Sequence, residues 1–292
     1  MSDARTILIF GAGYSGRAYA RVMAGETEAM YGTTRSLAKA GELVDAGVTP
    51  LLFDGIVRPP DVLAALRRAT DLVISIAPGE TGDPVLRLFA DDIAAAPKLR
   101  HITYLSTVGV YGDQDGAWVD EDTPCRPVSK RSTERVEAEQ DWLSLGARSG
   151  KPLAILRLSG IYGPGRNALV NLANGTARRL VKPGQVFNRI HVDDIAGALR
   201  FLAGRGLEGI FNVTDNEPAP PQDVVTFAAG LMGVTPPPEQ PFGTAELSPM
   251  ARSFYGENKR VSNEKLHALG YEFRHPDYRS AFERMWRDDC WR

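Results

Sequence analysis

The chain has 292 residues, of which 43% are hydrophobic and 24% are charged, a composition typical of soluble globular proteins. Lys and Arg number 34 against 36 Asp and Glu, so the formal net charge is -2 and no nucleic-acid partner is expected, because such partners favour a basic surplus. No apolar run approaches the roughly 20 residues of a membrane span. The two cysteines, Cys125 and Cys290, are far apart and lack metal-ligand spacing, so we expect a cytoplasmic protein with no disulfide, no metal site and no membrane association.

Short apolar runs alternate with longer helical patterns through the first half, which predicts βαβ units on a parallel sheet. The predicted strands are Thr6–Phe10, Ala29–Thr33, Thr49–Phe53, Asp71–Ile76, His101–Ser106 and Leu153–Leu158. The predicted helices are Ser15–Ala24, Leu37–Gly47, one capped by Asp61 and ending near Arg68, one from Asp83 to before Pro97, and Ser129–Arg148. Beyond Gly160 proline and glycine become frequent, which predicts a smaller lobe with one return to the sheet near Gly209–Thr214.

The first predicted strand is followed at once by the glycine-rich turn GAGYSG, residues 11–16. A G-x-G-x-x-G turn between a strand and a helix indicates dinucleotide binding. Gly11 allows a tight turn, Gly13 lets the backbone approach a pyrophosphate, and Gly16 lets helix and strand pack closely. The pyrophosphate then sits on N–H groups at the helix start, which include those of Tyr14 and Ser15.

The predicted fold is therefore α/β: a Rossmann-type, doubly wound parallel sheet with a smaller C-terminal substrate lobe. The NAD(P)-binding domain is predicted over residues 1–160, with a return segment near 186–215, and the lobe over residues 161–292.

The end of the second predicted strand favours NADP over NAD. NAD enzymes usually carry an acidic residue there to bind the ribose 2′-hydroxyl. Here the sequence reads Thr33-Thr34-Arg35-Ser36, without a carboxylate. Arg35 offers a fork of donors suited to a 2′-phosphate, and Thr34 and Ser36 add hydroxyls. A solvated Arg35 on a loop is the alternative, and NAD stays possible.

Further cofactor contacts are expected where later strands end, because ligands lie outside the carboxyl ends of parallel strands. Asp54 would lie near the adenine, and Ala77 and Pro78 beside the cofactor ribose. Ser106 ends the fifth strand. Turn chemistry is an equal explanation for Asp54, Ala77 and Pro78.

Four segments resemble the extended short-chain dehydrogenase/reductase family, which includes the sugar-nucleotide epimerases and dehydratases. They are YLSTVGVYG (104–112), LRLSGIYGPGR (156–166), RIHVDD (189–194) and FNV (211–213). Together with the glycine turn, these landmarks follow the family order over most of the chain. The resemblance implies a Ser or Thr that orients the substrate oxygen, a Tyr that exchanges the proton, and a Lys four residues later.

Thr107 stands at the family's Ser/Thr position, with strand-end capping as its alternative role. Counted from Tyr111, the positions of the family's Tyr and Lys fall on Arg131 and Arg135, and no tyrosine lies between Gly112 and Ser159. Arg131 cannot exchange a proton, because guanidinium stays charged. Arg135 could still hold ribose hydroxyls or a phosphate. The chain therefore resembles an atypical branch that lacks the Tyr-x-x-x-Lys dyad.

Replacement acids and substrate-binding groups can be proposed. Tyr111 and Tyr162 lie on loops after strands, and His191 could titrate near neutral pH, although in the family the residues around that histidine are largely structural. Arg166 and Arg189 could bind an anionic substrate, or act as ion-pair partners instead.

We expect an enzyme that uses NADP(H) on a small polar or nucleotide-linked substrate, as a monomer or homodimer. A non-catalytic NADP(H) sensor or binding protein is the alternative, because the dyad is missing. A nucleotide-sugar epimerase/dehydratase is a second alternative.

Overall fold

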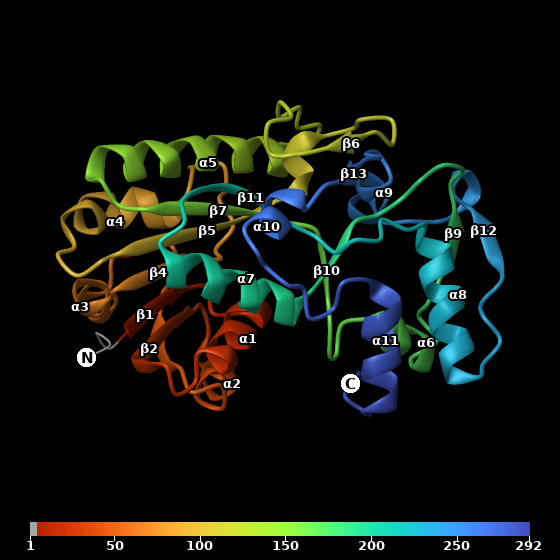
Figure 1. Ribbon diagram of the computed structural model, residues 1–292, viewed down its shortest axis with the longest axis horizontal. Helices are drawn as coiled ribbons and strands as arrows, with labels where there is room; N and C mark the ends of the chain where they lie inside the picture. Colours follow the sequence, from red (N-terminus) through yellow and green to blue (C-terminus); the bar gives the residue numbers. More distant parts are fainter. Residues whose placement is uncertain (1–4) are drawn as a thin grey trace. The chain divides into compact units, whose positions relative to one another are not determined.

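The computed structural model describes residues 5–292, and the chain divides into two compact units (Figure 1). The first unit contains the chain up to Thr107 together with Lys130–Arg157 and Ile195–Phe211. The second unit contains Val108–Ser129, Leu158–Asp194 and Asn212–Arg292.

A seven-stranded sheet forms the core of the first unit. In spatial order its strands are β3 (Thr49–Leu52), β2 (Thr27–Thr34), β1 (Arg5–Phe10), β4 (Asp71–Ile74), β5 (His101–Thr107), β7 (Leu153–Leu158) and β11 (Gly209–Val213). β1 pairs with β2 and β4, β2 pairs with β3, and β4 pairs with β5, all in parallel. The strand order runs outward from β1 in both directions, which confirms the predicted doubly wound, Rossmann-type sheet.

Helices cover both faces of this sheet. They are α1 (Tyr14–Val22), α2 (Ala40–Val44), α3 (Pro60–Arg68), α4 (Pro84–Ala95), α5 (Lys130–Ser149), α7 (Val192–Arg205) and the 3₁₀ turn η1 (Leu37–Lys39). Figure 1 shows α4 and α5 along one face and α1 and α7 along the other. The rings of Phe10, Phe53 and Phe89 pack in the core with centroids 5.5 to 5.7 Å apart.

The start of α4 is fixed by Asp83, as predicted. Its Oδ1 accepts from the backbone N–H of Val85 at 2.7 Å and of Leu86 at 3.2 Å, and its Oδ2 accepts from Trp142 Nε1 on α5 at 3.1 Å. Burial raises the pKa of this carboxyl group. Asp83 therefore caps one helix and holds a second one against it.

Two helix predictions need correction. The residue that caps α3 is Pro59, not Asp61, and Asp61 lies inside the first turn, where its Oδ1 accepts from Val62 N at 2.8 Å. Pro60 occupies the first helical position, where a missing N–H costs nothing. The helix predicted over Leu37–Gly47 is divided into η1 and α2, because Ser36 Oγ accepts from Ala38 N and favours a tight first turn.

The second unit consists of short strands paired two by two and of helices. The strands are β6 (Trp118–Val119), β8 (Gly160–Tyr162), β9 (Arg179–Val181), β10 (Arg189–His191), β12 (Glu239–Pro241) and β13 (Arg260–Val261). β10 pairs with β8, β12 with β9 and β13 with β6, each in parallel. The helices are α6 (Ala168–Ala173), α8 (Pro221–Met232), α9 (Pro249–Phe254), α10 (Glu264–Ala268) and α11 (Tyr278–Arg287), with 3₁₀ turns η2 (Val108–Tyr111) and η3 (Phe242–Thr244).

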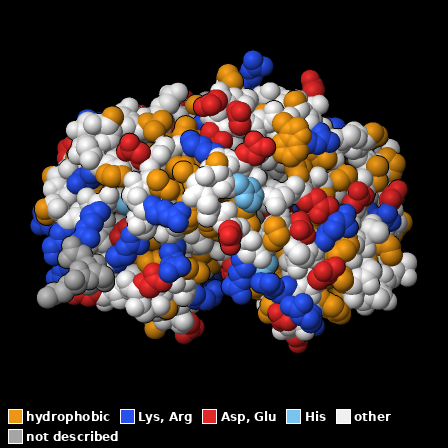
Figure 2. All heavy atoms as spheres, viewed as in Figure 1, with side chains coloured by type: hydrophobic (Ala, Val, Ile, Leu, Met, Phe, Trp, Pro, Cys, Tyr) orange, Lys and Arg blue, Asp and Glu red, His pale blue; other side chains and the backbone are white. Residues whose placement is uncertain are grey.

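On the face seen in Figure 2, basic and acidic side chains are interspersed with hydrophobic and polar ones. None of the helices within residues 5–292 has both the length and the apolar character needed to cross a bilayer. Neither Cys125 nor Cys290 forms a disulfide.

Candidate functional site

The glycine turn follows β1 directly and is tied to the end of β2. Gly11 N donates to Thr33 Oγ1 at 2.8 Å, and Ala12 N donates to Thr33 O at 3.0 Å. Gly11 has a φ of +81°, and a Cβ there would lie 2.9 Å from a side-chain carbon of Ile76. Both conformation and space therefore require glycine at position 11.

The other two glycines of the turn are in different surroundings. A Cβ on Gly16 would lie 3.2 Å from Cγ2 of Ile9, so this position is where α1 packs against β1. A Cβ on Gly13 would meet only the carbonyl oxygen of Gly11, at 4.0 Å, and Gly13 has an ordinary φ of -79°. Neither close packing nor a positive φ therefore accounts for glycine at position 13.

The N-terminus of α1 faces this turn without a capping side chain. Gly13 is the N-cap residue, no side chain accepts a hydrogen bond from the helix start, and the first turn contains no acidic residue. Ser15 is buried and Tyr14 is half-buried in this first turn. The partial positive charge of a helix N-terminus is thus not neutralised by the protein, as an anion-binding turn requires.

The residues after β2 have different contacts. Thr34 Oγ1 accepts from Ser36 N at 3.4 Å, and the Ser36 hydroxyl caps η1. Both hydroxyls thus have local partners. Arg35 is exposed, and among the described residues its guanidinium has no hydrogen-bond or ion-pair partner.

Asp54, Ala77 and Pro78 lie on loops that follow β3 and β4. Asp54 Oδ1 accepts from Ile56 N at 2.8 Å and from Val57 N at 3.2 Å, and these backbone bonds lower the pKa of Asp54. Asp54 thus stabilises a turn. Ala77 is exposed and Pro78 is half-buried.

A buried polar network lies behind the end of β5. Ser106 Oγ donates to Glu139 Oε1, and Arg157 binds the same carboxylate with Nη2 to Oε2 at 2.7 Å and Nε to both oxygens at 3.2 Å. The side chains of Arg157 and Glu139 are only 5% and 4% exposed. This network connects β5, α5 and β7. Ser106 was expected at this strand end, but the ion pair carries no local sequence signal, because its two partners belong to different elements.

Arg135, on α5, points its guanidinium to the end of β5. Its Nη1 donates to Leu105 O at 2.6 Å and to Tyr104 OH at 3.1 Å, and its charge lies 5.6 Å from the centroid of the Tyr104 ring. Thr107, at the last position of β5, is half-buried, whereas Arg131, one turn before Arg135, is exposed. In the first unit, Thr107 thus ends β5, and the guanidinium of Arg135 binds the same strand from α5.

Tyr111 belongs to the second unit and is fully buried. Its hydroxyl donates to Oδ1 of Asn212, the penultimate residue of β11, at 2.7 Å. A hydroxyl in this position stabilises the unit.

The proposed substrate residues are also in the second unit. Tyr162 and His191 are neighbours on β8 and β10, with ring centroids 5.3 Å apart, and burial raises the pKa of Tyr162 well above 10.0. Arg189 Nη1 donates to the carbonyl oxygens of Phe187 at 2.9 Å and Ala219 at 3.1 Å. Arg166 is exposed. Tyr162, Arg189 and His191 thus lie within the packed part of this unit.

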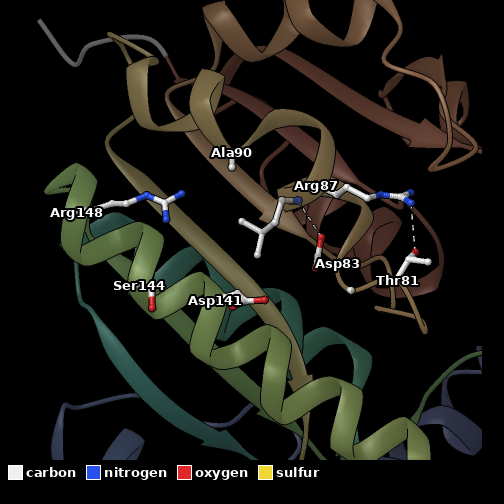
Figure 3. Close-up of a pocket in the computed structure, with 9 residues that line it drawn as sticks. Thr81, Asp83, Arg87, Ala90, Asp141, Ser144 and Arg148 are labelled. Carbon is white, nitrogen blue, oxygen red and sulfur yellow. Dashed lines mark hydrogen bonds between the residues drawn. The ribbon is translucent and has the colours of Figure 1, made fainter.

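A small groove between α4 and α5 of the first unit was not predicted from the sequence (Figure 3). Its volume is about 290 Å³, and its lining includes Asp83, Arg87, Asp141 and Arg148. Arg87 is directed away from the groove centre toward Thr81, whose hydroxyl lies 3.2 Å from Nη1. Charges of both signs line the groove.

Comparisons with known proteins agree with this fold. A solved structure of a conserved protein of unknown function from Silicibacter pomeroyi DSS is 45% identical, with a TM-score of 0.88 and coverage of 98% of this chain and 99% of that chain. Protein YeeZ from Escherichia coli K12 is 32% identical over 232 residues, 76% of this chain and 77% of its own. A 3-diazoavenalumate denitrifying reductase from Streptomyces sp is 27% identical over 211 residues, 66% of this chain and 67% of its own.

The model of the NAD dependent epimerase/dehydratase family matches residues 7–214, which include most of β1, the glycine turn and the other six strands of the main sheet. With this match, the chain belongs to the NAD-dependent epimerase/dehydratase family.

Proposed function

We propose that this protein is an NADP(H)-dependent oxidoreductase that acts on a small polar or nucleotide-linked substrate. The observation that carries the proposal is the space at Gly13. A side chain there would fit the fold, so the glycine is explained by a ligand that needs the backbone itself. A pyrophosphate at the uncapped start of α1 is such a ligand.

The preference for the phosphorylated cofactor rests on Arg35. It is exposed and follows β2, whose residue Thr33 holds the glycine turn through two hydrogen bonds. A bidentate guanidinium favours a phosphate over a hydroxyl, and no carboxylate stands nearby in sequence to bind the hydroxyl of NAD.

Two features support hydride transfer as the reaction: the residues at the end of β5 and the similarity to one reductase. NADPH, when bound, would supply a hydride for a substrate carbon, and solvent would supply the proton for the substrate oxygen. Thr107 would donate a hydrogen bond to that oxygen. Arg135, held by Leu105 O and Tyr104, would carry positive charge beside the cofactor in place of the family's lysine. The reductase from Streptomyces sp supports reduction as the reaction class.

Cofactor choice is tested by calorimetric titration of wild-type protein, Arg35→Ala and Arg67→Ala with NADPH and NADH. Arg67 is an exposed arginine of α3 and serves as the matched control. Wild type should bind NADPH at least tenfold more tightly than NADH, about 1.4 kcal/mol. Arg35→Ala should lose this preference by weakening NADPH alone, and Arg67→Ala should keep it. Equal affinities of wild type for both cofactors would contradict the NADP assignment.

A non-catalytic NADP(H) binder is the second candidate, favoured by the arginines at positions 131 and 135 and by the internal partners of Arg135. Oxidation of NADPH in the presence of a panel of aldehydes, ketones and nucleotide sugars separates the two candidates. Substrate-dependent turnover that falls at least tenfold in Thr107→Val supports the enzyme. Absence of turnover, together with different affinities for NADP⁺ and NADPH, supports the binder, since a ligand shifts states only by differential binding.

A further inference from the structure

The second unit contains a cluster of two histidines and one aspartate that the proposed function does not use. His191 ends β10, Asp193 lies in the first turn of α7, and His275 precedes α11. One nitrogen of each imidazole and one carboxylate oxygen of Asp193 lie within 4.8 Å of one another. His191 is 1% exposed and His275 is 3% exposed, whereas Asp193 is partly exposed.

The neighbouring Asp194 holds His275 in this place. Its Oδ1 accepts from Arg274 N at 2.6 Å, its Oδ2 accepts from His275 N at 3.0 Å, and its backbone oxygen accepts from the Tyr271 hydroxyl at 2.8 Å. Asp194 is itself 1% exposed. The backbone that carries His275 is therefore anchored to the start of α7, which also carries Asp193.

The Asp193 carboxylate faces one nitrogen of each ring, and Nδ1 of His191 also accepts from the backbone N–H of Asp193 at 3.2 Å, a contact that a metal ion on this nitrogen would replace. Oδ2 of Asp193 lies 3.8 Å from Nδ1 of His191 and 3.6 Å from Nε2 of His275. Nε2 of His275 is buried and has no hydrogen-bond partner among the described residues. The two imidazole rings are tilted by 34° to each other, with their centroids 3.8 Å apart.

We propose that His191, Asp193 and His275 bind one divalent transition-metal ion, with zinc as the best fit. Two imidazoles and one carboxylate suit zinc and its neighbours rather than magnesium or calcium. Ligand atoms on a tetrahedral zinc, with bonds of about 2.0 to 2.1 Å, are roughly 3.3 to 3.4 Å apart. The observed separations from Asp193 exceed this by a few tenths of an ångström, which side-chain rotation can close. Three protein ligands leave the fourth position to water or another ligand.

The guanidinium of Arg274 would compete with the ion for the carboxylate of Asp193. Its Nη1 lies 3.6 Å from Oδ2 of Asp193, and its side chain is 65% exposed, so it can swing into solvent at little cost. The metal would replace this weak cation–carboxylate contact. Removal of the Arg274 charge should therefore tighten metal binding.

The test uses the full-length protein after treatment with a chelator and dialysis. Zn²⁺ is titrated by calorimetry, and Co²⁺ is titrated while the visible absorption that reports tetrahedral coordination is recorded. The variants are His275→Gln, Asp193→Asn and Arg274→Ala, with His267→Gln as the control for an exposed histidine of α10. Thermal unfolding of each metal-free variant checks that it is folded.

Wild type and His267→Gln should bind one ion per chain, His275→Gln and Asp193→Asn should bind at least tenfold more weakly, and Arg274→Ala should bind more tightly. If His275→Gln does not fold, the result for Asp193→Asn decides, because its carboxylate is partly exposed and its replacement preserves shape. Absence of stoichiometric Zn²⁺ binding in wild type, or equal binding in wild type and Asp193→Asn, would overturn the proposal and leave a purely structural histidine pair.

Discussion

The three glycines of the turn differ in the physical reason for which glycine is present. Gly11 adopts a φ of +81° and lies against Ile76, so any side chain there is strained as well as crowded. Gly16 brings α1 close to Ile9, and a methyl group there would push helix and strand apart. Gly13 has neither a positive φ nor a close neighbour, so a side chain at this position can weaken cofactor binding without disturbing the packing of the fold.

Also at the scale of single residues, the buried pair of Glu139 and Arg157 should be costly to break. Arg157→Met leaves a buried carboxylate that keeps its hydrogen bond from Ser106 but loses its positive partner, and the expected loss is about 3 to 5 kcal/mol of unfolding free energy. The double variant Glu139→Gln/Arg157→Met should lose much less than the sum of its single changes, because no unpaired charge is left. Urea unfolding of the four proteins of this cycle measures the coupling, and strictly additive losses would refute it.

At the scale of elements, the junction of α4 and α5 depends on Asp83. Asp83→Ala removes the helix cap and leaves the buried N–H of Trp142 without an acceptor, so we expect a loss of about 2 to 4 kcal/mol. Asp91→Ala, at an exposed position of the same helix, is the matched control and should change the stability by less than about 0.5 kcal/mol. Similar unfolding midpoints for these two variants would show that Asp83 is not the cap on which the junction depends.

Local sequence signals predict the helices and strands of the first unit, but not the contacts between them. The strands and helices of the first unit were predicted to within a few residues because apolar runs and glycine turns are local signals. Asp61 is predicted as the cap of α3 because acidic residues are common caps. The helix instead begins at Pro60, two residues closer to the N-terminus than an Asp61 cap would place it. Side chains from separate elements gave no such signal. Arg157 and Glu139, or His191 and His275, meet only because the chain has folded.

For the whole molecule, we expect acid to lower stability through a buried histidine of the central sheet. Burial lowers the pKa of His101 below 6.5, although Nε2 is within 2.9 Å of Leu207 O. As the pH falls below about 6.5, this histidine takes up a proton in the unfolded chain before it does so in the folded protein. The free energy of unfolding therefore decreases as the pH falls from about 6.5 to the lower pKa of the folded state. Thermal unfolding between about pH 7.5 and pH 5.5 should show a steeper loss for wild type than for His101→Gln. Parallel curves would contradict this role for His101.

Calorimetric titration of wild type, Gly13→Ala and Gly204→Ala with NADPH shows directly whether the glycine turn binds the cofactor. Both glycines have room for a methyl group and neither has a positive φ, but only Gly13 is in the turn. We predict that all three proteins unfold at similar urea concentrations, that Gly204→Ala binds like wild type, and that Gly13→Ala binds at least tenfold more weakly. Wild-type affinity in Gly13→Ala would contradict the claim that the pyrophosphate rests on the backbone of this turn.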